Sequence, residues 1–159
     1  GADNDVILGD LGNDTIDGGD GVDLLTGGDG DDVFVFGAGD AGLPDDDEDS
    51  DVFGLVDTIT DFVSADDLID IGNLGQSSAD VIKAQSGITL SGLDAATTYA
   101  QERLDAHAGG TDVAVLEVGS DTYLFYNSGG TTAAIDSIIK LVGVDADDVT
   151  TDSFVEFSV

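Results

Sequence analysis

Large apolar residues return every nine positions along the first quarter of the chain. These positions hold Ile7, Ile16, Leu25 and Phe34, and an Asp stands two places before each of them, at Asp5, Asp14, Asp23 and Asp32. In a three-residue segment such as 15–17, the middle side chain points to the opposite face from its neighbours, as in a short strand with one inward residue. The pattern therefore predicts short strands joined by six-residue turns over residues 1–36.

Glycines occupy the turns of this repeat, at the first, second and fourth places of each nine-residue unit. The unit is written G-G-x-G-x-D-x-U-x, where U is a large apolar residue. The turn glycines are Gly9, Gly12, Gly18, Gly19, Gly21, Gly27, Gly28 and Gly30. Glycine permits positive φ and a close approach of neighbouring backbones, which a tight six-residue turn needs. Asp3 and Asp10 stand where the pattern has glycine.

Two such units are expected to make one coil of a parallel β-roll, so that turns 18 residues apart stack. Stacking places Asp5 over Asp23 and Asp14 over Asp32, with turn carbonyls aimed between them. Two carboxylates and several carbonyls form an all-oxygen ligand set, which suits Ca²⁺ better than Mg²⁺. A flexible Gly/Asp-rich linker is the alternative, but such a linker has no reason to keep apolar residues at a strict interval.

In these motifs the chain resembles the repeats-in-toxin (RTX) family of type I–secreted bacterial proteins. The resemblance covers residues 1–36 and implies a calcium-loaded parallel β-roll, with Asp5, Asp14, Asp23, Asp32 and the turn glycines at the Ca²⁺ sites. It also implies export from a Gram-negative cell through a type I secretion apparatus of ABC transporter, membrane fusion protein and outer-membrane duct. Folding would then take place outside the cell.

The repeat decays after Phe36. Residues 37–41 are typical of a degenerate fifth turn whose acid, Asp40, arrives one place early. Residues 44–51 are a charge run that partly mimics an EF-hand loop, although Ser50 stands at the sixth loop position and Val56 at the twelfth. The run is interpreted as a solvated acidic loop, with Ca²⁺ binding as the alternative.

Residues 56–71 predict two strands joined by a turn around residues 64–66. The segment resembles the one that closes the β-roll in serralysin-type proteases and related secreted proteins. By that resemblance Asp57 and Asp61 complete a Ca²⁺ site on the last coil. The alternative is that both are surface acids on a half-exposed strand.

The remaining residues predict a mixed C-terminal region. Residues 94–109 favour a helix with Asp94 as its N-cap and Gly109 as its C-terminal stop. Residues 111–118 and 121–127 favour a hairpin about Gly119. The aromatic residues of this hairpin could stack on carbohydrate, although aromatics in strands usually pack in a core. Residues 135–142 fit helix and strand periodicity alike. Their resemblance to the C-terminal target region of type I secretion substrates favours a strand.

Composition narrows the possible functions. The 159-residue chain has 35 acidic and 3 basic residues, a formal net charge of −32, one His and no Cys or Met. Nucleic acid and anionic membrane surfaces would be repelled. No apolar run is long enough to span a membrane as a helix, and disulfides and thiolate metal sites are excluded. The absence of Met predicts that the sequence is a processed or partial chain.

These observations predict a mostly all-β protein: a calcium-bound β-roll (residues 1–36), a degenerate turn and acidic loop (37–55) and a β-sandwich-like cap with one short helix (56–159). The predicted function is a calcium-dependent folding and export module of a larger secreted or cell-surface protein. It is not expected to be an enzyme, since no nucleophile has an evident base beside it; paired carboxylates leave glycosidase chemistry as an alternative. A calcium-dependent adhesive, surface-layer or polysaccharide-binding module, with self-assembly or glycan contact, is the other alternative.

Overall fold

The computed structural model describes residues 1–37, 40–41, 56–72, 81–84, 90–106, 112–127 and 134–155. The acidic run 44–51, together with His107 and Gly109, lies outside the described residues, so the EF-hand alternative stays untested. Within the described part, no helix is both long and apolar enough to cross a membrane.

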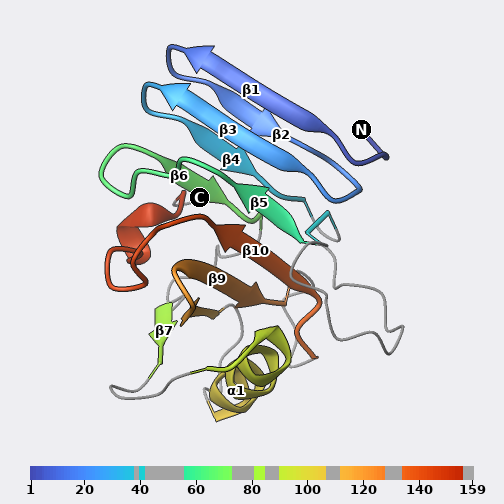
Figure 1. Ribbon diagram of the computed structural model, residues 1–159, viewed down its shortest axis with the longest axis vertical. Helices are drawn as coiled ribbons and strands as arrows, with labels where there is room; N and C mark the ends of the chain where they lie inside the picture. The colour runs from blue at the N-terminus through green and yellow to red at the C-terminus, as the bar shows by residue number, and fades with distance from the viewer. Residues whose placement is uncertain are drawn as a thin grey trace.

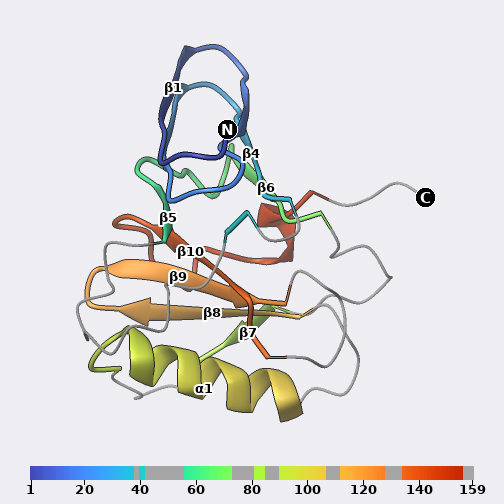
Figure 2. The same cartoon turned by 90° about the vertical axis from the view of Figure 1, so that its right-hand side faces the viewer.

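The repeats form two stacks of short parallel strands. The six strands are β1 (Val6–Leu11), β2 (Thr15–Asp17), β3 (Leu24–Asp29), β4 (Val33–Val35), β5 (Asp57–Ile59) and β6 (Leu68–Asp70). Strands β1, β3 and β5 pair in parallel on one side, and β2, β4 and β6 pair in parallel on the other. The chain therefore winds as a flattened coil, which is seen nearly end-on in Figure 2.

The strand register confirms the predicted coil length. Ile7 pairs with Leu25 and Ile16 with Phe34, in both cases 18 residues apart. The third coil continues the same rows, because Leu25 pairs with Ile59 and Phe34 with Ile69. Strands β5 and β6, which sequence analysis grouped with the C-terminal cap, thus lie on the roll, and residues 36–56 connect its second and third coils.

The C-terminal elements extend one sheet of the roll. They are β7 (Val81–Lys83), α1 (Leu93–Ala106), β8 (Val113–Val118), β9 (Asp121–Tyr126), β10 (Ser137–Leu141) and the 3₁₀ turn η2 (Thr151–Ser153). Strand β10 pairs in parallel with β5 and antiparallel with β9, giving a seven-stranded sheet in the order β1-β3-β5-β10-β9-β8-β7. Figure 1 shows this sheet running from the roll to the level of α1.

Alternate side chains of the C-terminal strands enter two cores. On one face, Val115, Leu124 and Ile139 join the interior of the roll, together with Leu25 and Phe34. On the other face, residues one position away pack beneath α1: Ala114, Leu116, Tyr123, Phe125 and Ile138, against Ala96 and Ala100 of the helix. Because strand side chains alternate between faces, one sheet can bury both sets.

The expected fold class is confirmed: the protein is mostly β, with parallel β-roll sheets and one α-helix among the described residues. The cap takes the form of an extended sheet covered by α1 (Figure 2). The helix begins at Leu93, so Asp94 lies in its first turn and is not its N-cap. The hairpin about Gly119 is confirmed, and residues 137–141 form a strand.

The aromatic residues of the hairpin are core residues. Tyr123, Phe125 and Tyr126 are all at most 2% exposed, so their rings do not form a surface for stacking on carbohydrate. Packing against α1 and the roll offers these rings more apolar contact than a solvent-facing position would.

Candidate metal centre

The turns of the roll are stacked more closely than side chains would allow. A Cβ placed on Gly9 would lie 2.5 Å from the Gly27 carbonyl oxygen, and one on Gly21 would lie 2.8 Å from that of Asp3. Gly21, Gly28 and Gly30 also have φ between +107° and +147°, a region that L side chains rarely adopt. Glycine is therefore required in these turns both for conformation and for the approach of carbonyl groups.

The Asp at the sixth place of each unit links one turn to the next. The Asp5 amide donates to Oδ1 of Asp23 (2.8 Å), and the Asp14 amide donates to Oδ1 of Asp32 (2.9 Å). These contacts join turns on the same side of the roll and confirm the predicted stacking of Asp5 with Asp23 and of Asp14 with Asp32.

The second carboxylate oxygen of these residues has no partner. Oδ2 of Asp14, Asp23 and Asp32 is buried and accepts no hydrogen bond within the described part of the chain. Each of these oxygens lies against the first glycine of its own turn; Oδ2 of Asp14, for example, would be 2.7 Å from a Cβ on Gly9. A buried carboxylate oxygen without a partner is costly, and its recurrence in three successive turns favours a positively charged ligand at these oxygens. Carboxylate and carbonyl oxygens in this arrangement fit Ca²⁺.

The third coil adds one carboxylate to each of the two series of stacked Asp residues. The Asp23 amide donates to Oδ1 of Asp57 (2.7 Å), and the Asp32 amide donates to Oδ1 of Asp67 (3.0 Å). The two rows are therefore Asp5-Asp23-Asp57 and Asp14-Asp32-Asp67. Asp57 and Asp67 are both buried, so Asp57 is not a surface acid on a half-exposed strand.

Asp61 occupies a different position. Its two carboxylate oxygens accept hydrogen bonds from the Gly27 and Gly28 amides, each at 2.9 Å. The side chain thus caps two backbone amides in the C-terminal half of β3, as an anion would in a backbone nest.

Burial changes the protonation of the third coil. Desolvation raises the pKa of Asp57 to about 7, with the charges of Asp23 and Asp40 acting in the same direction and the Asp23 amide opposing them. The pKa of Asp67 is raised for the same main reason, against hydrogen bonds from the Val63 and Asp32 amides. Burial therefore shifts both carboxyls toward the protonated form in the absence of a cation.

Sequence analysis missed Asp67. The available signal was its position two residues before Ile69, which repeats the spacing of Asp32 to Phe34 and of Asp57 to Ile59. The spacing was hidden because Asp67 follows Asp57 by ten residues instead of nine, and because Asp66 beside it offers a competing acid. Parallel pairing of β6 with β4 resolves the ambiguity.

Carbonyl groups must supply much of any cation site here. Among the described residues, no three His, Cys, Asp or Glu side chains come together in a group that could hold a metal ion. Each stacked pair contributes two carboxylates at most, while turn carbonyls approach from both coils.

Comparison with known proteins agrees with this arrangement. The family model for the RTX calcium-binding nonapeptide repeat, which comprises four copies, matches residues 1–34 and 9–41. Residues 1–41 are RTX calcium-binding nonapeptide repeats. The RTX repeats imply that the chain binds Ca²⁺, and proteins with RTX repeats are typically secreted. None of the curated proteins matches the chain.

Two solved structures share the fold of this chain. They are the AlgE6R3 and AlgE6R2 subunits of the mannuronan C5-epimerase of Azotobacter vinelandii, with TM-scores of 0.51 and 0.54 and sequence identities of 24% and 22%. Each match covers 98% of this chain and, respectively, 80% and 89% of the other. The likeness extends the comparison beyond the repeats, because it includes the C-terminal sheet and helix.

Proposed function

We propose that the chain is a calcium-dependent folding and export module of a larger secreted protein and carries no catalytic activity of its own. The observation that supports this most directly is the set of buried, unpartnered Oδ2 atoms on Asp14, Asp23 and Asp32, which lie in both rows. The proposed ligands are these three residues with Asp5, Asp57 and Asp67, and carbonyls of the turns that contain Gly9, Gly12, Gly18, Gly19, Gly21, Gly27, Gly28 and Gly30. Bound Ca²⁺ would neutralise the stacked carboxylates. Asp61 contributes by capping the amides of Gly27 and Gly28.

The proposed mechanism links calcium concentration to folding. Where free calcium is scarce, like charges in stacked turns repel one another and the chain stays unfolded, a state that can pass through a secretion duct. Outside the cell, calcium near millimolar reaches the roughly 10⁻⁴–10⁻³ M dissociation constants of extracellular calcium modules. Binding then favours the folded state, because the sites exist only there.

Far-UV circular dichroism tests the folding mechanism. We expect the purified chain to lack most of its β signal in chelator at neutral pH, and to gain it on addition of Ca²⁺ but not of equimolar Mg²⁺. A full β signal in chelator at neutral pH would refute the proposed folding switch. Export requires a separate test, namely secretion of the chain from a cell that carries a type I apparatus.

A polysaccharide-binding role is the second candidate, because both similar structures are subunits of an enzyme named for mannuronan. Two features oppose a polyanionic ligand. The chain has three basic residues, and two of them form ion pairs: Lys83 with Asp147, and Lys140 with Asp121 at 2.8 Å. Calcium titration in the presence of alginate separates the candidates, since co-sedimentation with the polymer supports glycan binding and a free monomer supports the export module.

A further inference from the structure

Tyr126, at the end of β9, is a polar side chain buried in the core that the roll shares with the C-terminal strands. It is 2% exposed and belongs to the same cluster as Leu25 and Ile59. Its hydroxyl is buried and forms no hydrogen bond within the described part of the chain. A buried donor without an acceptor costs free energy that an apolar Phe would not, so the position points to a partner for the hydroxyl.

The strand register places this tyrosine beside the third coil. Asp57 pairs with Ile139 of β10, and Ser137, two positions before Ile139, pairs with Tyr126 of β9. Because side chains alternate along a strand, Asp57, Ser137 and Tyr126 all lie on the face of the sheet that forms the roll core. All three are buried, so they form a polar line that crosses from the roll into the C-terminal sheet.

Negative charge surrounds the hydroxyl. Burial raises the pKa of Tyr126, and the neighbouring Ser137 hydroxyl opposes the rise. The charges of Asp57, Asp136 and Asp40 raise the pKa further, and that of Asp57 has the largest effect of the three. The hydroxyl therefore stays protonated at neutral pH and remains a hydrogen-bond donor.

Among these acids, Asp57 is the acceptor that most needs a partner. Asp136 and Asp40 are partly exposed and can be solvated, whereas Asp57 is 2% exposed. Its Oδ1 accepts the Asp23 amide at 2.7 Å, which leaves Oδ2 for a further donor. A carboxylate has about four lone-pair sites, so Asp57 can accept both donors and still bind a cation.

We propose that the Tyr126 hydroxyl donates to the Asp57 carboxylate when the third coil binds Ca²⁺, and so positions this ligand from the C-terminal sheet. The inference rests on the calcium binding proposed above. In the first two coils, the stacked carboxylates accept backbone amides of the roll itself. Tyr126 is thus a positioning residue, which ties the cation site of the third coil to strand β9.

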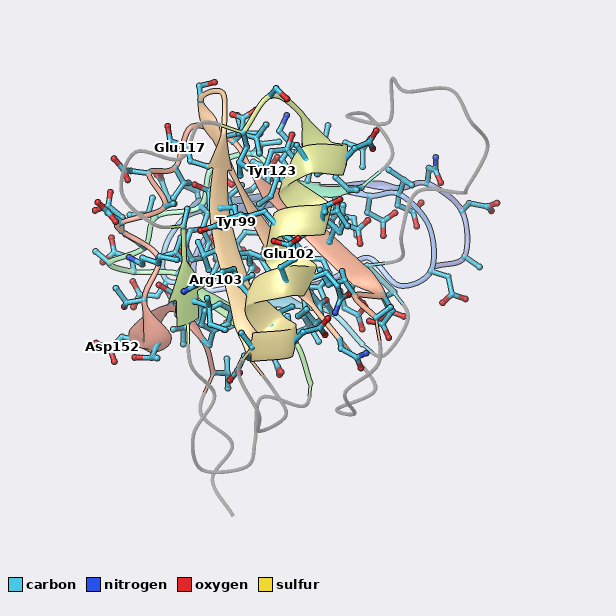
Figure 3. All side chains as sticks on the ribbon, turned by 90° about the horizontal axis from the view of Figure 1, so that it is seen from below. Tyr99, Glu102, Arg103, Glu117, Tyr123 and Asp152 are labelled. Atoms are coloured by element: carbon cyan, nitrogen blue, oxygen red, sulfur yellow. The ribbon has the colours of Figure 1, made fainter. Side chains whose placement is uncertain are left out.

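Terbium luminescence tests whether Tyr126 lies at a cation site. Tb³⁺ substitutes for Ca²⁺ at oxygen sites, and a tyrosine beside it transfers excitation energy to it. The chain has three tyrosines and no tryptophan. Tyr99 and Tyr123 belong to the cluster beneath α1, and Figure 3 shows both on the side that bears this helix. On tyrosine excitation, wild type should give Tb³⁺ emission, Tyr126→Phe should lose most of it, and Tyr123→Phe should keep it.

Calcium titration followed by far-UV circular dichroism separates positioning from packing. If the Tyr126 hydroxyl stays unpartnered, Tyr126→Phe removes a buried unsatisfied group and should leave the calcium midpoint unchanged or lower. The proposed hydrogen bond predicts the opposite, a midpoint raised by roughly three- to tenfold. Tyr123→Phe removes a hydroxyl from the same strand but the opposite face, and should shift the midpoint less.

Far-UV circular dichroism at saturating Ca²⁺ shows whether each variant has folded. Tb³⁺ emission that survives in folded Tyr126→Phe, or that is lost equally in Tyr123→Phe, would overturn the inference, as would a midpoint of Tyr126→Phe at or below that of wild type. Asp57→Asn should also lose the emission; if it does not, the sensitised ion lies elsewhere and the inference fails. None of these results would alter the calcium-dependent folding proposed above, which a full β signal in chelator would refute separately.

Discussion

At the scale of single residues, the repeated Asp has two structural tasks. One carboxylate oxygen accepts an amide from the coil before it, as Oδ1 of Asp32 does from Asp14. The other oxygen is buried without a partner. The first contact sets the spacing between coils, and the second creates the demand for a cation. Neighbouring acids such as Asp29 are exposed and have neither task.

Replacing one row residue tests this distinction. Asp32→Asn keeps an acceptor for the Asp14 amide but removes a charge from the cation site, so the calcium concentration at the folding midpoint should rise by about tenfold or more. Asp29→Asn removes the same charge from an exposed place in the same turn and should change the midpoint little. Calcium titrations followed by circular dichroism compare the two, and equal shifts would show that only net charge matters.

The raised pKa of Asp57 predicts how the stability of the calcium-free fold depends on pH. Its pKa is about 7 in the fold, against 3.8 for an ordinary Asp. Between pH 3.8 and about 7, the folded state therefore binds more protons than the unfolded state does. Protonation of Asp57 stabilises the fold, and this stabilisation is complete below about pH 3.8 and lost as pH rises through about 7. In calcium-depleted buffer, far-UV circular dichroism should therefore show a larger folded fraction at about pH 5 than at about pH 8.

The variant Asp57→Asn supplies the control for this pH effect. It should flatten the dependence, because the amide does not titrate. Stability that increases from the lower to the higher pH in the calcium-free protein would contradict the assignment.

At the scale of elements, local sequence pattern and tertiary contacts contribute unequally to the formation of each strand and helix. The nine-residue period locates β1 to β4, since each short strand needs one inward apolar residue. The expected three-residue length holds for β2 and β4, whereas β1 and β3 have six residues and run on through Gly9 and through Gly27, positions that the repeat assigns to turns. Residues 135–142 lack such a signal, and β10 becomes a strand because β5 and β9 hydrogen-bond to both of its edges. The helix α1 depends on small residues, Ala96 and Ala100, which let it lie close to β8.

The close approach of α1 can be tested by overpacking. Ala100 is fully buried, so Ala100→Leu has no room for its added atoms and should destabilise the calcium-loaded fold by about 1–3 kcal/mol. Ala106→Leu adds the same atoms at an exposed position at the end of the helix and should stay within about 0.5 kcal/mol of wild type. Urea unfolding in Ca²⁺ measures both, and a neutral Ala100→Leu would show that α1 is packed loosely.

At the scale of the whole molecule, one core joins the roll to the C-terminal strands. The cluster that contains Leu25, Phe34 and Ile69 also contains Leu124, Ile139 and Phe154. The chain end is tied to the roll directly, because Phe154 forms a β-bridge with Ile69 and the Val155 amide donates to the Ile69 carbonyl at 3.0 Å. Calcium in the turns should therefore stabilise elements that contain none of the proposed ligands.

The three tyrosines provide a probe of this coupling. Tyr99, Tyr123 and Tyr126 all lie outside the roll, so near-ultraviolet circular dichroism of tyrosine reports on the C-terminal part alone. On calcium titration, the tyrosine signal should change with the same midpoint as the far-ultraviolet β signal. Phe154→Ala should separate the two midpoints or move both to higher calcium concentration. A tyrosine signal that is already native in chelator would show that the cap folds independently of the roll.

The amino-acid sequence by itself determined the repeating part of this protein: the coil of 18 residues, the inward apolar row, the glycine turns and the stacking of Asp5 with Asp23 and of Asp14 with Asp32. These follow from local chemistry, since every unit carries its own strand residue, turn residues and acid. The division into three domains and the export role stay predictions.

Tertiary structure alone decided how the charge of −32 is used. Only strand pairing across residues 36–56 brings Asp57 and Asp67 into the two rows and assigns Asp61 to the amides of Gly27 and Gly28. The physical reason is that these roles depend on which backbone lies beside each carboxylate. Pairing partners 34 or 35 residues away are set by the packing of the whole core and leave little trace in local periodicity.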